Sequence, residues 1–146
     1  MTMTNAIHRP QWVPVSGHRL RVIGVHFDVV RIEGGRGEAV AGRLIEVTDG
    51  DAGPVVLEQV GFRWTYFLLR PGTVHRHAWL PGVQRFGLNA RDMRTVTYVG
   101  IPALDGNTFP LRWYSEPTPE TPYVDPDSLL TAVRTAQADR EEPHRE

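Results

Sequence analysis

The sequence contains no cysteine and no lysine, and each absence removes a class of chemistry. Without cysteine there is neither a disulfide framework nor a thiolate metal site, which suits a reducing cytoplasm. All 16 basic residues other than histidine are arginine, so Schiff-base catalysis by a lysine is excluded. A GC-rich genome explains this arginine usage, and selection for guanidinium forks that hold phosphate or carboxylate is the alternative.

Long apolar runs and a strong charge of either sign are also missing. No stretch approaches the roughly 20 apolar residues that cross a bilayer, and residues 1–10 have no apolar core typical of a signal peptide. These features predict a cytoplasmic protein with no membrane association. The formal net charge of −1 does not by itself indicate nucleic-acid binding, although a neutral total is compatible with a basic face.

The 146 residues fit one domain. We expect an irregular N-terminal arm over residues 1–18, a single α+β domain over residues 19–138, and a charged, flexible tail over residues 139–146. Strands are predicted over short segments rich in β-branched and aromatic residues, namely 19–22, 25–32, 55–60, 63–70, 83–86, 95–101 and 109–114. The segments 55–60 and 63–70 are close enough to form a hairpin.

Two helices are predicted, one early and one at the C-terminus. The first spans Glu38–Val47, where apolar residues recur at helical spacing after a glycine cluster at residues 34–37. The second starts after Asp125, a good N-cap, with Pro126 in the first helical position. The resulting fold class is α+β, with a mostly antiparallel or mixed sheet of about six strands.

Two groups of residues are candidates for metal or acid chemistry. His75 and His77 would share a face if they lay on a strand, and His26 or Asp28 could complete a metal site. A solvated loop is the alternative for this segment. Asp28 is an acid in an apolar strand and requires a partner or water. Arg31 or Arg63 could pair with it, or it could act as a metal ligand.

Five motifs follow one another in a characteristic order. An acid-bearing strand and glycines lie at 27–35, an aromatic strand ends in Pro-Gly within 61–73, and a Leu-Pro-Gly-Val turn lies in 80–87. A strand ending in proline occupies 97–102, and a tryptophan-bearing strand occupies 111–113. In this order the chain resembles the bifunctional primase–polymerase N-terminal domain of the archaeo-eukaryotic primase superfamily, and more closely a divergent actinobacterial group of small proteins similar to it.

The departures from that family remove most of its chemistry. Asp28 stands at the first metal position, but Val30 and Gln84 replace the other two acids, and Trp64 or a neighbour replaces the nucleotide-contacting histidine. Two-metal nucleotidyl transfer requires at least two carboxylates. The resemblance therefore implies a scaffold that is kept without its catalysis, and favours a protein that is not an enzyme and has no cofactor.

The hypothesis is a regulatory or binding module for nucleotides or single-stranded nucleic acid. We expect the ligand to contact Asp28, Arg31, Arg63, Trp64 and Arg85, with Asp28, Trp64 and Arg85 in one cleft. Tryptophans serve either as core packing or as stacking platforms for bases. Two alternatives remain open at this point: an accessory protein that binds another protein and has no nucleotide role, and a metal-dependent enzyme that uses His75, His77 and an acid.

Overall fold

The computed structural model describes residues 9–87 and 97–141 of the chain. The outer parts of the predicted arm and tail lie outside the described residues, as does the start of the strand predicted over 95–101. The elements in chain order are β1 (His18–Val22), β2 (Asp28–Ile32), α1 (Gly34–Val47), β3 (Val55–Glu58), β4 (Thr65–Leu69), the 3-10 helix η1 (Val74–Arg76), β5 (Gln84–Phe86), β6 (Tyr98–Pro102), β7 (Leu111–Ser115) and α2 (Pro126–Glu141).

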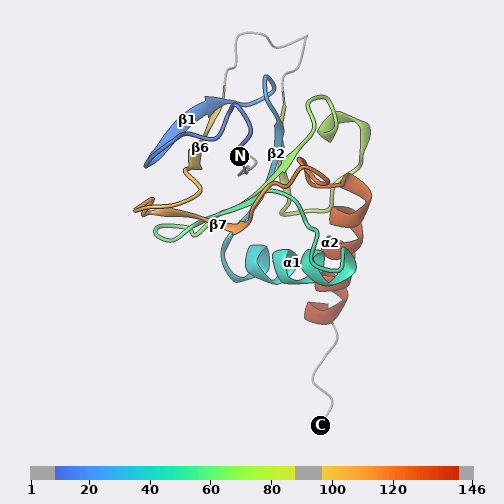
Figure 1. Ribbon diagram of the computed structural model, residues 1–146. Helices are drawn as coiled ribbons and strands as arrows, with labels where there is room; N and C mark the ends of the chain where they lie inside the picture. The colour runs from blue at the N-terminus through green and yellow to red at the C-terminus, as the bar shows by residue number, and fades with distance from the viewer. Residues whose placement is uncertain (1–8, 88–96, 142–146) are drawn as a thin grey trace.

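Five strands form one sheet in the order β5-β2-β4-β3-β7, and all neighbours in it are antiparallel. β1 pairs with β6 in a separate antiparallel unit, the β1–β6 ribbon. The hairpin predicted from the two neighbouring strand segments is confirmed as β3 and β4. Figure 1 shows α1 and α2 on one side of the sheet and the ribbon on the other. The α+β class is confirmed, with seven strands in the described residues.

The helix-facing side of the sheet carries the first core. Val30 and Ile32 of β2 point toward the helices together with Phe67 and Leu69 of β4, because alternate residues of a strand share a face. All four side chains are fully buried. The helices contribute Val40, Ala41, Leu44, Leu129, Ala132, Val133 and Ala136. Full burial of a large apolar side chain contributes about 1.5–3 kcal/mol, so this face holds the helices on the sheet.

The ribbon-facing side carries a second core. Phe27, Val29 and Leu68 lie on this side, and the ribbon adds Val99 and Ile101. The N-terminal segment also takes part: Trp12 is 5% exposed, and its ring meets that of Phe27 edge-on at 5.1 Å. Residues 9–17 have no regular secondary structure, yet this tryptophan anchors them to the sheet.

The first helix begins earlier than its sequence pattern predicts. α1 starts at Gly34, inside the glycine cluster expected to form a turn. Gly37 is buried against β2 and β4, and a Cβ there would lie 2.5 Å from the Ile32 carbonyl oxygen. Glycine is therefore required at position 37 for the close approach of α1 to the sheet. This packing outweighs the poor helix propensity of glycine.

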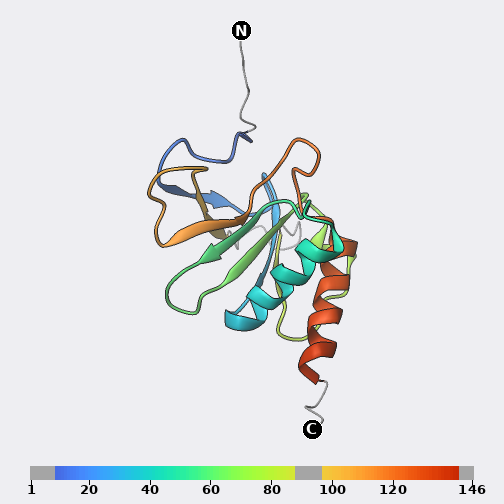
Figure 2. The same ribbon diagram turned by 60° about the horizontal axis from the view of Figure 1, so that its bottom comes forward.

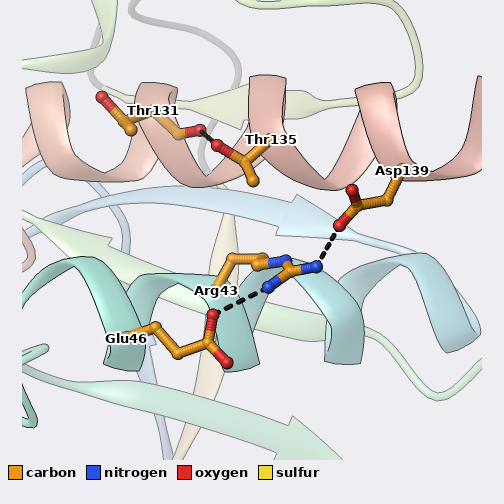
Figure 3. A network of polar contacts seen from close by, with 5 residues as sticks. All are labelled: Arg43, Glu46, Thr131, Thr135 and Asp139. Atoms are coloured by element: carbon orange, nitrogen blue, oxygen red, sulfur yellow. Dashed lines mark hydrogen bonds and ion pairs between the residues drawn. The ribbon is translucent and has the colours of Figure 1, made fainter.

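The C-terminal helix follows its predicted start. The backbone N–H of Ser128 donates to the Asp125 carboxylate at 2.9 Å, which confirms Asp125 as the N-cap. Figure 2 shows α1 and α2 side by side under the sheet. The Arg43 guanidinium of α1 pairs with Glu46 one turn later and with Asp139 of α2, so it bridges the two helices (Figure 3). In residues 9–87 and 97–141, no helix is long and apolar enough to cross a membrane.

Candidate functional site

Arg31 of β2 lies at the centre of a cation–aromatic cluster on the ribbon-facing side of the sheet. Its register partners are Tyr66 in β4 and Gln84 in β5. The guanidinium carbon is 3.9 Å from the centroid of the Trp64 ring and 4.9 Å from that of Phe86. The Arg31 Nε–H donates to the Gln84 side-chain oxygen at 2.6 Å. Two ring faces and the hydrogen bond to Gln84 thus hold this guanidinium in place.

The charge of Arg31 has no carboxylate partner within the described part of the chain. The arginine ion pairs found there involve Arg43 and Arg63 instead. Arg31 is half-buried, and a half-buried cation without a counter-ion is costly unless its surroundings offset the charge. The aromatic faces and the Gln84 amide offset part of that cost. The remaining positive potential favours an anionic group beside the guanidinium.

A pocket of about 200 Å³ opens next to Arg31, between the sheet and the β1–β6 ribbon. Its lining comprises Ile23, Val29, Arg31, Tyr66, Phe86, Thr97 and Tyr98. Five of these residues are apolar or aromatic, and the polar groups are one guanidinium and the hydroxyls of two tyrosines and a threonine. Pockets for whole drug-sized ligands usually measure about 300–1,000 Å³. This one suits a single planar ring or a phosphate group.

The Tyr66 phenol stays protonated at neutral pH. Burial raises its pKa above the ordinary 10.0, the nearby Glu58 carboxylate raises it further, and the positive charge of Arg31 with its hydrogen bond to the phenol opposes the rise. A neutral phenol is both a donor and an acceptor. The pocket therefore combines a permanent cation with a neutral hydroxyl that can bind either kind of polar partner.

Aromatic rings extend the cluster away from the pocket. Phe62, in the turn between β3 and β4, is 66% exposed, and its ring centroid lies 6.1 Å from that of Trp64. Phe62, Trp64, Arg31 and Phe86 consequently form a continuous row of flat groups. Such a row is the kind of surface on which unpaired bases stack.

The structure separates Asp28 from this cluster. Asp28 lies on the helix-facing side, two residues before Val30, and is fully buried. One carboxylate oxygen accepts the backbone N–H of Val74 at 3.1 Å, and the other has no hydrogen-bond partner among the described residues. Burial raises the pKa of Asp28, while the backbone N–H groups around η1 and the charge of His75 oppose the rise.

The expected common cleft of Asp28, Trp64 and Arg85 is therefore not formed, because adjacent strand positions alternate between the two faces of the sheet. Arg85 is exposed and lies opposite Val30, on the helix-facing side. Arg63 lies in the turn before β4 and pairs with Glu38 of α1. Of the five residues predicted to bind ligand, only Arg31 and Trp64 are in direct contact at this site.

The two histidines considered for a metal site do not lie on a strand. His75 is part of the 3-10 helix η1 and is exposed. His77 follows it, with Nδ1 3.2 Å from the Thr73 carbonyl oxygen and Nε2 3.6 Å from the Asp127 carboxylate of α2. Within residues 9–87 and 97–141, no three potential ligands cluster in a way that could hold a metal ion.

Sequence reasoning did not identify Tyr66, Phe86 and Tyr98 as members of the site. Phe86 and Tyr66 join Arg31 through strand register, and Tyr98 reaches the pocket from the ribbon. The sequence signal for Phe86 was its position two residues after Gln84. Alternate residues of a strand share a face, so Gln84 and Phe86 both lie on the face of Arg31 when β5 pairs with β2.

Comparisons of the chain with protein-family models, with curated proteins and with solved structures give no match.

Proposed function

We propose that this protein is a non-catalytic module that binds nucleotides or single-stranded nucleic acid at the Arg31 pocket. The observation that carries the proposal is the Arg31 guanidinium: it is half-buried, lacks a carboxylate partner in the described residues, and is stacked between Trp64 and Phe86 beside an open pocket. A phosphate would neutralise the charge of this guanidinium, and a base would extend the row of rings by stacking on it.

The surroundings of the pocket support an anionic ligand. Between Arg9 and Phe27 the chain carries Arg19 and Arg21 and no acidic residue, and this segment includes β1 of the ribbon. Of the acidic residues near the row, Glu38 pairs with Arg63, and Glu58 accepts the Trp64 backbone N–H and lies close enough to Tyr66 to raise its pKa. Positive potential at the ribbon end would steer a phosphate toward the pocket.

This proposal includes the resemblance to the primase–polymerase domain: the chain would keep the scaffold of that family without its catalysis. Val30 and Gln84 cannot bind a divalent cation as carboxylates do, and Gln84 instead accepts the Arg31 Nε–H. Asp28 is buried and accepts a backbone N–H. These contacts support a role in binding and regulation in place of two-metal transfer.

The direct test is a fluorescence-anisotropy titration of the protein with a labelled single-stranded oligonucleotide at several salt concentrations. Contact with about three phosphates gives a log–log salt slope of about −2 on single strands. Arg31→Gln should weaken binding about tenfold or more and make the slope shallower by about 0.7, the amount expected for one lost phosphate contact.

Arg134→Gln is the matched control, because Arg134 is exposed on α2 and lies outside the pocket. It should leave affinity unchanged. Calorimetric titration with a nucleoside monophosphate tests the nucleotide as a ligand on its own. Absence of binding to either probe at low salt contradicts the proposal and favours a protein partner, and equal losses in the two arginine variants contradict the assignment to Arg31.

A further inference from the structure

The outer edge of the β1–β6 ribbon has open backbone hydrogen-bonding groups. The Gly17 carbonyl accepts the Ala103 N–H at 2.8 Å, and the Ile23 N–H donates to Thr97 at 2.9 Å, so these positions bond toward β6. Backbone direction alternates along an antiparallel strand. The N–H and C=O groups of His18, Leu20 and Val22 therefore point away from β6, and none of them has a backbone partner in the described residues.

The side chains of this edge alternate between basic and apolar. Arg19 and Arg21 lie on one face, opposite Ile101 and Val99 in the register, and the Arg21 Nε–H donates to the Trp12 carbonyl. Leu20 lies on the other face and is 70% exposed. An extended chain laid along β1 would thus meet a guanidinium face and an apolar face in turn.

A second copy of the same strand is a poor occupant. Two β1 strands paired antiparallel about Leu20 would place Arg19 of one copy directly opposite Arg21 of the other. Like charges in directly opposed cross-strand positions destabilise a pair. Basic residues on an open edge generally prevent self-association of this kind. A strand that alternates acidic with apolar side chains is the complementary occupant, because its acidic residues would face Arg19 and Arg21 and its apolar residues would face Leu20.

We propose that β1 captures an extended acidic segment of a partner protein by adding it to the ribbon as a third strand. The free N–H and C=O groups of Leu20 supply backbone hydrogen bonds at the centre of the edge. Arg19 selects an acidic side chain on one face, and the exposed Leu20 side chain packs against an apolar one on the other. This surface is separate from the Arg31 guanidinium, so its partner and the nucleotide ligand need not exclude one another.

The probe is a short fluorescent peptide of alternating valine and glutamate, N-methylated on every second residue. Methylation removes the N–H donors from one of its edges, so the peptide cannot assemble with itself but can still pair through its other edge. We expect saturable binding by anisotropy. The same peptide with its remaining N–H groups methylated should not bind, and equal binding of the two peptides would overturn strand addition.

Leu20→Pro tests the edge from the protein side. Its N–H points outward, so proline removes a donor to the added strand without removing a ribbon hydrogen bond, and proline is tolerated on edge strands. We expect about a tenfold loss of peptide affinity. Leu20→Val is the matched control, since it keeps the N–H and an apolar side chain, and should bind within about threefold of the wild type. Thermal unfolding checks that both variants fold.

Charge reversal distinguishes an acidic peptide from nucleic acid on the same basic ribbon. Arg19→Glu should weaken binding of the glutamate peptide and increase binding of its lysine counterpart. Binding of a labelled oligonucleotide that falls with Arg19→Glu but not with Leu20→Pro, together with no binding of the peptide, would overturn the proposal. A failure of the nucleotide and oligonucleotide titrations that test Arg31 leaves these peptide results unaffected.

Discussion

Replacing Gly37 with alanine should destabilise the protein, although alanine is the better helix former. A Cβ at this position would lie 2.5 Å from the Ile32 carbonyl oxygen, 2.7 Å from Thr65 Oγ1 and 2.9 Å from Thr65 Cβ. Ile32 and Thr65 are register partners at the end of the β2–β4 ladder, on two inner strands of the sheet. Because neither strand can retreat without breaking this pairing, α1 itself would have to move outward.

The expected magnitude follows from two opposing terms. Helix propensity favours alanine over glycine by about 1 kcal/mol. Inserting a methyl group into a packed contact costs about 1–3 kcal/mol, and three contacts closer than real Cβ atoms allow place Gly37 at the upper end. The net loss in unfolding free energy should be about 1–2 kcal/mol for Gly37→Ala.

Gly42 in the same helix provides the matched control. A Cβ there would have its nearest neighbour, the Tyr114 hydroxyl, at 3.8 Å, which is an ordinary contact. Gly42→Ala should therefore stabilise the protein by about 0.5–1 kcal/mol. Urea unfolding of both variants measures the difference at an unchanged m-value. A Gly37→Ala variant as stable as the wild type, or a shift of stability in the same direction for both substitutions, would contradict this expectation.

Three further variants probe other parts of the molecule. The folded state holds the Asp28 proton to a higher pH than the unfolded chain, so stability is full below the ordinary pKa of 3.8 and declines as pH rises through the raised value. Asp28→Asn should remove this decline, so the difference in unfolding free energy between the variant and the wild type should change with pH. A difference that stays constant in urea unfolding across pH would contradict this prediction. Trp64→Leu should weaken oligonucleotide binding about tenfold or more by removing a stacking surface while leaving the salt slope intact, and a changed slope in the anisotropy titration would argue against stacking. Asp139→Asn should shift the thermal midpoint by less than about 2 °C, because its pair with Arg43 is exposed; a larger shift would mean that this bridge holds the helices together.

Local sequence signals predicted most of the elements, because those signals act within a few residues. Asp125 and Pro126 located the start of α2, and the apolar spacing of Val40, Leu44 and Val47 located α1 except for its first turn. The glycines of that turn favour a loop by propensity, and the close approach of Gly37 to Ile32 and Thr65 is a long-range contact that propensity does not reveal. The division of the strands into a five-stranded sheet and a ribbon depends on long-range pairing that propensity does not encode.

The site was predicted less completely, for a related reason. Alternation within β2 assigns Asp28 and Arg31 to opposite faces, but the positions of Trp64 and Phe86 around Arg31 depend on how β4 and β5 pair with β2. A prediction that grouped residues by motif order placed Asp28 and Trp64 in one cleft. Strand register separates them, and the same register assembles the row that the motifs did not indicate.

The confinement of the Arg31 guanidinium between two rings has a kinetic consequence. A side chain that is already immobilised loses little conformational entropy when it meets its ligand, so affinity is not reduced by an ordering step. Association should then proceed at a rate governed by diffusion and electrostatic steering, and differences between ligands should appear mainly in their dissociation rates. Lysine could not reproduce this behaviour, because its flexible ammonium group has no plane for Trp64 and Phe86 to hold.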